Sequence, residues 1–187
     1  LADSYSAECS RDVLLAKELG FTGNTLPVIP NGGGFSTEHF LLPSLPPHER
    51  KAIAVKGYHG WVGRAKIALQ AIMSMSKELV GLQIVLYSCN RSVAKLAKKV
   101  SRRTGLEILA FAKNSLSHEE VMELFGRSKV YVGLSESDGI STSMLEAMAM
   151  GAIPVQTSTS CCDEWFDVSG VSVTNISTDD VVSAIRS

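Results

Sequence analysis

Two carboxylates, Asp138 and Glu146, lie eight positions apart and enclose a run of three hydroxyl residues at 141–143. An apolar segment with helical spacing follows this run and ends at Gly151. The free amides at a helix N-terminus form a ready anion site, to which hydroxyl side chains add donors. A carboxylate one turn into the helix can accept hydrogen bonds from sugar hydroxyls. The pattern therefore predicts a site for a phosphorylated sugar or a nucleotide.

A second candidate loop, residues 56–64, contains three glycines and has a basic residue at each end, Lys56 and Arg64. Glycine lets the backbone approach a ligand closely, and the two cations suit an anionic group. The spacing matches neither the dinucleotide-binding fingerprint nor the phosphate loop of nucleoside triphosphatases, so these two classes are disfavoured. Taken alone, the loop is equally consistent with a plain turn.

Other chemistries remain open for the same residues. Asp138 and Glu146 could form a general acid and base, or they could be a turn carboxylate and a solvated helix residue. The sequence Gly-Ile-Ser at 139–141 lacks the second glycine of a nucleophile elbow. The four cysteines and four histidines have no metal-ligand spacing, so we expect free thiols and no metal site.

The composition is that of an ordinary globular chain, with 187 residues of which 45% are hydrophobic and 20% are charged. A net charge of −1 creates no general attraction for nucleic acid, so we expect no nucleic-acid partner. No apolar run approaches the roughly 18 residues that a membrane-spanning helix needs. The chain opens with Leu rather than Met and with no signal peptide, so we expect an excised piece of a longer, cytoplasmic polypeptide.

Short apolar runs alternate with amphipathic segments along the chain. Strands are expected at 26–29, 52–55, 83–87, 107–111, 130–134, 153–156 and 171–173. Helices are expected at 66–79 and 91–103, and after the capping-box residues Ser117 and Ser177. Several strands are continuous Val/Ile/Leu runs, as in a parallel sheet buried on both faces. We therefore predict an α/β fold with a Rossmann-like, doubly wound parallel sheet, whose ligands bind beyond the carboxyl ends of the strands.

Residues 31–50 interrupt this alternation with a glycine run and three prolines, which predicts a linker. Residues 51–187 then form the main domain, and residues 1–30 form a small element that belongs to another domain. His118 lies within the capping box that follows Ser117, which predicts a surface position.

The segment 135–155 resembles the nucleotide-sugar-binding half of GT-B glycosyltransferases, close to the retaining family 4 group. That group carries a glutamate, seven further residues, a second glutamate followed by Ala-Met-Ala-x-Gly, and a Pro-Val strand. Here Asp138 and Glu146 bracket seven residues, Ala-Met-Ala-Met-Gly follows, and Pro154-Val155 completes the pattern. Val-Ile-Pro-Asn-Gly at 28–32 resembles the linker between the two lobes of these enzymes. The first carboxylate is an aspartate in place of the usual glutamate.

The resemblance implies a role for each matching residue. Glu146 is expected to bind the ribose hydroxyls of the donor, and Asp138 is expected to face the transferred sugar. Arg64 and Asp138 are the expected catalytic residues, with Arg64 and Lys56 on the pyrophosphate. The remaining expected donor-binding residues are Gly57, Tyr58, Lys113, Gly139, Ile140, Ser141, Thr142 and Ser143.

The same resemblance implies a hexosyltransferase of polysaccharide biosynthesis that uses a UDP- or GDP-sugar, a glycan or lipid-linked acceptor and no cofactor. The amino-terminal lobe would be missing from this chain, so we expect the isolated piece to be inactive. One alternative is a sugar-nucleotide epimerase of GT-B architecture. Another is a non-catalytic module that binds a nucleotide or a glycan.

The predicted helix at 91–103 carries six basic residues and no acidic one. A solvated outer face explains this pattern simply. The alternative is contact with an anionic membrane surface, where each basic residue adds roughly 1 kcal/mol. That contact would suit a lipid-linked acceptor and a peripheral position at the inner face of the membrane.

Overall fold

A six-stranded parallel sheet forms the centre of the computed structural model, which describes all residues except 1, 31–33, 35, 37, 39–40 and 167–168. The strands are β3 (Ala52–Lys56), β6 (Gln83–Cys89), β7 (Glu107–Ala112), β8 (Ser128–Gly133), β9 (Ile153–Thr157) and β10 (Val171–Val173). They lie in the order β10-β9-β8-β3-β6-β7, and every neighbouring pair is parallel. Counted along the chain, this is the Rossmann-like order 3-2-1-4-5-6. The predicted fold class is confirmed.

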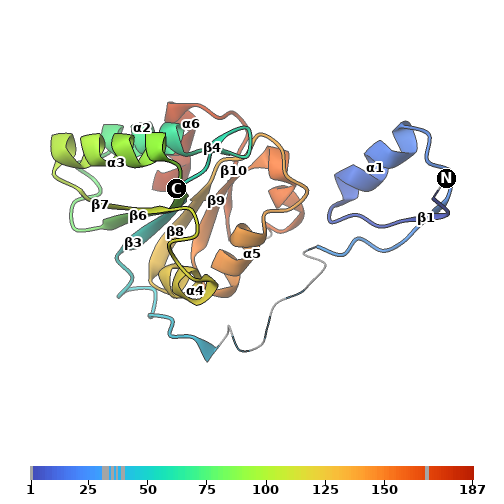
Figure 1. Ribbon diagram of the computed structural model, residues 1–187, viewed down its shortest axis with the longest axis horizontal. Coiled ribbons are helices and arrows are strands. Elements are labelled where there is room, and N and C mark those ends of the chain that lie inside the picture. Colours follow the sequence, from blue (N-terminus) through green and yellow to red (C-terminus); the bar gives the residue numbers. More distant parts are fainter. Residues whose placement is uncertain (1, 31–33, 35, 37, 39–40, 167–168) are drawn as a thin grey trace.

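Helices cover both faces of the sheet (Figure 1). One face carries α2 (Ala65–Ser74), α3 (Arg91–Thr104) and α6 (Thr178–Arg186), and the other carries α4 (His118–Gly126) and α5 (Thr142–Ala149). Along β3, Ile53 and Val55 pack into the first layer, whereas Ala52 and Ala54 pack into the second. Because both faces of the strand are buried, its sequence is a continuous apolar run.

Polar caps set the positions at which the helices begin. Asn90, Ser117, Ser141 and Ser177 cap α3, α4, α5 and α6, and each side chain accepts a hydrogen bond from a backbone amide of the first turn. Each of these helices follows a strand of the parallel sheet and therefore begins at the carboxyl edge. The helix N-termini gather along that edge, where this fold binds ligands.

One predicted helix is shorter in the structure. The helix expected at 66–79 ends at Ser74, and residues 75–80 form turns. Met75 and Leu79 are nevertheless buried, so the apolar spacing that predicted the helix continues beyond its end.

The strand predicted at 26–29 is wrong. The backbone amides of Leu26 and Ile29 donate to the carbonyls of Tyr5 and Ala7, but this segment is not part of a β ladder. The side chains of Leu26 and Ile29 are 48% and 54% exposed, so burial does not favour a longer strand there.

A small βαβ unit lies beside the main sheet (Figure 1). It comprises β1 (Ser4–Tyr5), α1 (Ser10–Glu18) and β2 (Asn24–Thr25), and the two strands pair in parallel. All nine residues of α1 are described, and all of them remain at least partly exposed. The unit falls within the element that we predicted at residues 1–30.

The predicted linker at 31–50 lies partly outside the described residues. Arg50, at its end, is 5% exposed. Its Nε donates to the carbonyl of Leu45 at 2.8 Å, and its Nη1 donates to the carbonyl of Ser128 at 3.2 Å. These bonds fasten the chain that enters β3 to the beginning of β8.

The basic helix α3 packs through Val93, Ala97 and Val100 and exposes all six of its basic residues. Its solvated outer face fits the simpler of the two interpretations of the sequence, and contact with a membrane surface stays a prediction. Within the described part of the chain, no helix combines the length and apolar character needed to cross a bilayer.

Candidate functional site

The two candidate loops lie side by side at the carboxyl edge of the sheet. One follows β3 and the other follows β8, and these strands are neighbours. The chain runs from β3 to β6 and β7 in one direction and then returns to β8 on the other side of β3. In a doubly wound sheet, such a reversal marks the crevice beyond the strand ends where ligands usually bind.

Lys56 and Asp138 form the polar centre of this crevice. Lys56 Nζ lies 3.8 Å from Asp138 Oδ2, and the two side chains are only 13% and 32% exposed. Burial lowers the pKa of Lys56, while the negative charges of Asp138 and Glu146 oppose that shift. Burial also raises the pKa of Asp138, against the attraction of Lys56. Both groups are therefore poorly hydrated charges that a polar ligand could satisfy.

The glycine-rich loop is a hairpin, which the sequence did not predict. β4 (His59–Gly60) and β5 (Gly63–Arg64) pair antiparallel, with Trp61 64% exposed at the tip. The backbone amide of Arg64 donates to the Leu134 carbonyl at 2.7 Å, and that of Glu136 donates to the Trp61 carbonyl at 2.8 Å. The hairpin is thus fastened to the loop that follows β8.

The Arg64 side chain forms an ion pair with Glu136. Glu136 was not among the predicted site residues, and it neutralises the cation that we expected on the pyrophosphate. A diphosphate would therefore have to compete with this carboxylate for the guanidinium.

Gly57 has a packing role that explains its presence. A Cβ at this position would lie 2.4 Å from the Tyr87 carbonyl oxygen and 2.5 Å from Cys89 Sγ, so only glycine fits against β6. The neighbouring Tyr58 places its ring 5.7 Å from Lys56 Nζ, a distance suited to a cation–π contact. The predicted donor contacts of both residues stay predictions.

Glu146 lies in the second turn of α5, with its side chain 11% exposed. Its Oε1 lies 2.7 Å from Nε2 of His118, the first residue of α4. His118 is exposed as predicted, but its contact with Glu146 was missed. The α4 N-terminus lies at the same carboxyl edge as α5, and that topological rule could have brought the two residues together.

Two of the residues predicted at the start of α5 face the interior. Ile140 belongs to the core, and Ser141 is 1% exposed because its hydroxyl caps the helix. Gly139 and Ser143 are partly exposed and Thr142 is exposed, so these three can meet a ligand.

Two buried tyrosine hydroxyls lie beneath this helix N-terminus. Within the described part of the chain, the Tyr87 and Tyr131 hydroxyls lack a hydrogen bond of good geometry, although they approach Ser143 and Ser141. Burial raises the pKa of Tyr131 to about 12, so both groups stay protonated donors at neutral pH.

The start of α1 covers the Asp138 loop. Arg11 Nη2 donates to the Asp138 carbonyl at 2.9 Å, and Arg11 Nη1 donates to the Thr159 carbonyl at 2.7 Å. A Cβ on Gly139 would meet a carboxylate oxygen of Asp12 at 3.4 Å. The sequence had no signal for this long-range contact.

Lys113 lies apart from the other predicted site residues. It is exposed just after β7, the edge strand, with β6 between that strand and β3. Its side chain makes no hydrogen bond or ion pair with any described residue. Of the predicted site residues, Lys56 and Asp138 therefore form an ion pair, and the charge of Glu146 also acts on Lys56.

Comparison with known proteins assigns this arrangement to a family. The profile described as Glycosyl transferases group 1 matches residues 50–187. The chain belongs to this family. No curated protein matches the sequence. The match covers the whole Rossmann-like domain of this glycosyltransferase chain, including both loops at the crevice.

Solved structures show the same fold at low sequence identity. Sucrose-phosphate synthase from Thermosynechococcus elongatus is 15% identical, with a TM-score of 0.77 over 100% of this chain and 49% of that chain. A UDP-forming α,α-trehalose-phosphate synthase from Burkholderia xenovorans is 13% identical, with a TM-score of 0.72 over 98% of this chain and 52% of that chain. The C-terminal domain of a Francisella tularensis group 1 glycosyltransferase is 16% identical, with a TM-score of 0.65 over 82% and 86%.

The chain spans about half the length of the two synthases. Family and fold together identify it as the carboxy-terminal, Rossmann-like half of a GT-B glycosyltransferase. The resemblance drawn from segment 135–155 is confirmed at this level.

Proposed function

We propose that this lobe binds the nucleotide-sugar donor of a retaining glycosyltransferase, in the crevice between β3 and β8. The observation that carries the proposal is the partly buried Lys56–Asp138 pair at the switch point of the sheet. The complete enzyme would transfer a hexose from a UDP- or GDP-sugar to a glycan or lipid-linked acceptor. The transfer needs no cofactor in this scheme, because the donor carries its own leaving group.

The carboxyl edge of the sheet is best suited to the diphosphate of the donor. Lys56 supplies a poorly hydrated cation, and the amides at the start of α5 supply free donors. Arg64 joins them when the diphosphate displaces Glu136. As the sugar–phosphate bond breaks, negative charge grows on the leaving diphosphate, and these fixed donors stabilise it.

Glu146 and Asp138 orient the two sugars of the donor. The Glu146 carboxylate is nearly buried and already accepts from one neighbour, His118, so its remaining lone pairs can receive ribose hydroxyls. Asp138 faces the transferred hexose from the loop before α5. An aspartate side chain is one methylene shorter than a glutamate side chain, so this contact depends on the position of the Asp138 loop. Arg11, at the start of α1, holds that loop by donating to the Asp138 carbonyl.

Structural relatives support the choice of donor and stereochemistry by analogy of fold. One trehalose-phosphate synthase is UDP-forming, and another structure concerns glycosyl transfer with retention by trehalose-6-phosphate synthase. Because this chain covers about half of such enzymes, we expect it to bind donor but to transfer sugar only when the amino-terminal lobe is present.

A thermal-shift panel of UDP, GDP, ADP and their hexose conjugates tests the proposal. A ligand at 100 times its dissociation constant should stabilise the chain by about 2.7 kcal/mol. Lys56→Met should reduce that shift, whereas Lys129→Met, at an exposed position near the opposite end of β8, should leave it unchanged. If none of the nucleotides shifts the unfolding temperature, this chain has no donor site.

A further inference from the structure

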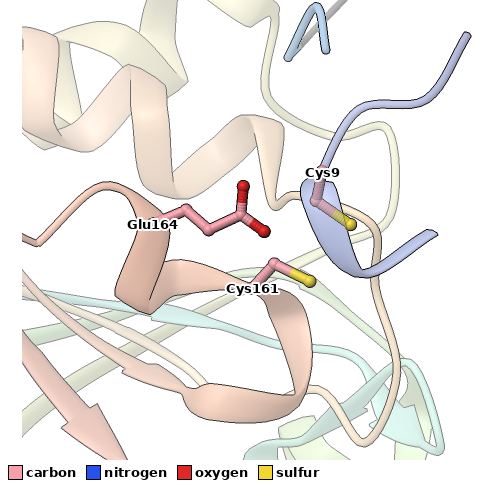
Figure 2. Close-up of side chains that lie close together, drawn as sticks. All are labelled: Cys9, Cys161 and Glu164. Atoms are coloured by element: carbon pink, nitrogen blue, oxygen red, sulfur yellow. The ribbon is translucent and has the colours of Figure 1, made fainter. Parts of the chain in front are cut away.

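Two cysteines and a glutamate meet where the small βαβ unit contacts the main domain (Figure 2). Cys9, Cys161 and Glu164 each place one potential ligand atom within 4.8 Å of the others. Cys9 immediately precedes α1, whereas Cys161 and Glu164 lie beyond β9 in the other domain. The fold thus joins residues that the sequence spacing did not connect.

The two thiols are buried, whereas the carboxylate is exposed to solvent. Cys9 is 0% exposed and Cys161 is 7% exposed, while Glu164 is exposed. Cys161 joins the short turns η2 (Ser158–Ser160) and η3 (Cys162–Glu164) with a φ of 51°, in the left-handed region that favours glycine. A non-glycine residue held in this conformation is typical of functional sites.

Ser10 fixes the orientation of the carboxylate. Its backbone amide donates to both Glu164 oxygens, at 3.0 and 3.1 Å, and its hydroxyl donates to Oε2 at 3.0 Å. A carboxylate has about four lone-pair positions, so these bonds leave capacity for a metal ion. Hydrogen bonds of this kind orient the ligands of metal sites.

We propose that Cys9, Cys161 and Glu164 bind a zinc ion that clamps the amino-terminal unit onto the main domain. Two thiolates and one carboxylate are a donor set that zinc accepts in tetrahedral geometry. Zinc–sulfur and zinc–oxygen bonds of about 2.3 and 2.1 Å place tetrahedral donors about 3.5–3.8 Å apart. The three atoms already lie within 4.8 Å of one another, so the site requires them to move closer by about 1 Å at most. Water completes the fourth position on the exposed side of Glu164.

The site keeps a negative charge when zinc is bound. Two thiolates and a carboxylate carry −3, and the zinc ion reduces this to a net −1; the Arg11 cation acts on Cys161 but is already paired with Asp12 at 3.0 Å. Burial, with the neighbouring Cys9 thiol, raises the pKa of Cys161 to about 12, so this residue is a neutral thiol without a metal. Zinc binds the thiolate form of cysteine, so binding releases protons to water and weakens as the pH falls.

Arg11 connects the proposed zinc site to the Asp138 loop. Arg11 follows directly after Cys9 and Ser10, and its guanidinium donates to the carbonyls of Asp138 and Thr159. A metal at Cys9 would hold Arg11 in place and so order this loop. The zinc site itself does not depend on the proposed donor specificity.

Zinc titration of the reduced, chelator-treated 187-residue chain tests the inference, with a chromophoric chelator as competitor. We expect one equivalent of zinc per chain. Loss of a hydrogen-bonding partner of a metal ligand typically weakens metal binding by roughly 10- to 100-fold. We expect a larger loss when a ligand itself is replaced, in Cys9→Ser, Cys161→Ser and Glu164→Gln. The matched controls Cys89→Ser and Asp163→Asn should retain the affinity of the unchanged chain.

Binding that survives both cysteine substitutions, or that falls well short of one equivalent, would overturn the proposal. X-ray absorption at the zinc edge gives a second readout on the unchanged protein, which avoids variants that fold poorly. Two sulfur ligands at about 2.3 Å are expected. A shell of nitrogen and oxygen alone would refute the site.

Discussion

Replacing Lys56 by methionine should raise the pKa of Asp138. The two charges are 3.8 Å apart. Coulomb's law gives their attraction at that distance as about 1 kcal/mol in a water-like dielectric and about 4 kcal/mol at an effective dielectric of 20. Because Asp138 is 32% exposed, the real value lies between these limits. Losing Lys56 removes that stabilisation from the ionised form alone, so the carboxyl pKa should rise.

The direction of this change follows from what already acts on Asp138. Burial raises its pKa above the ordinary value, and Lys56 is the largest opposing influence. Without the cation, burial acts with less opposition, and the protonated acid persists to higher pH. Methionine retains the length and much of the packing volume of lysine, so the change is mainly one of charge.

Carbon-detected NMR of labelled aspartate side chains, followed as a function of pH, measures this pKa directly. Lys129→Met is the matched control, because Lys129 is exposed near the start of β8 and Asp138 follows its far end. The control should leave the titration of Asp138 unchanged. If Lys56→Met also leaves it unchanged, the two groups do not form a pair and the polar centre of the crevice is wrong.

Three further changes test separate parts of the account. Glu146→Gln should weaken nucleotide-sugar binding at least about 10-fold in calorimetry without lowering the unfolding temperature, because it removes one charged hydrogen-bonding group. Gly57→Ala should destabilise the fold by about 1–3 kcal/mol in urea unfolding, since its methyl group would overlap β6, whereas Gly139→Ala should cost less. Phe125→Ala should cost about 3–5 kcal/mol, because the ring is fully buried in the α4/α5 layer.

Each of these results has a clear contrary outcome. Unchanged affinity in Glu146→Gln would remove that carboxylate from the donor site. Equal stability of the Gly57→Ala and Gly139→Ala variants would show that β3 and β6 are less tightly packed than described. A loss below about 1 kcal/mol for Phe125→Ala would mean that this layer repacks easily.

The membrane interpretation of α3 is tested by sedimentation with anionic vesicles at low and high salt. Each basic residue near such a surface contributes roughly 1 kcal/mol, and salt screens this attraction. Salt-sensitive binding that falls when Lys98 and Lys99 become glutamine would support it. Equal sedimentation with neutral and anionic vesicles would leave α3 as a solvated face.

Local signals in the sequence were sufficient for the central sheet and for the starts of several of its helices. The inner strands of the central sheet are apolar runs because both faces are covered, and the serine caps mark where α4 and α6 begin. The Asp138 and Lys56 loops could be placed at one edge because parallel strands end together. These features depend on neighbouring residues or on a general rule of topology.

Contacts between distant segments were not predictable in the same way. Arg11 reaches the carbonyl of Asp138 across 127 positions, and Ser10 reaches Glu164 across 154. The Cys9 and Cys161 thiols meet through the same packing of two separate units. The Glu136–Arg64 pair depends on a hairpin that glycine spacing alone did not reveal.

The start of α1 contacts the Asp138 loop from the side of the small βαβ unit, which we predicted to belong to another domain. The position of that unit is therefore linked to the proposed donor site through Arg11.

Two-dimensional NMR of the isotopically labelled chain during titration with UDP- and GDP-hexoses tests the central claim most directly. Binding between β3 and β8 predicts saturable shifts of backbone amides in residues 56–64 and 136–146, with the far ends of these strands unchanged. Shifts confined to other surfaces, or no shift at millimolar nucleotide, would contradict a donor site in this lobe.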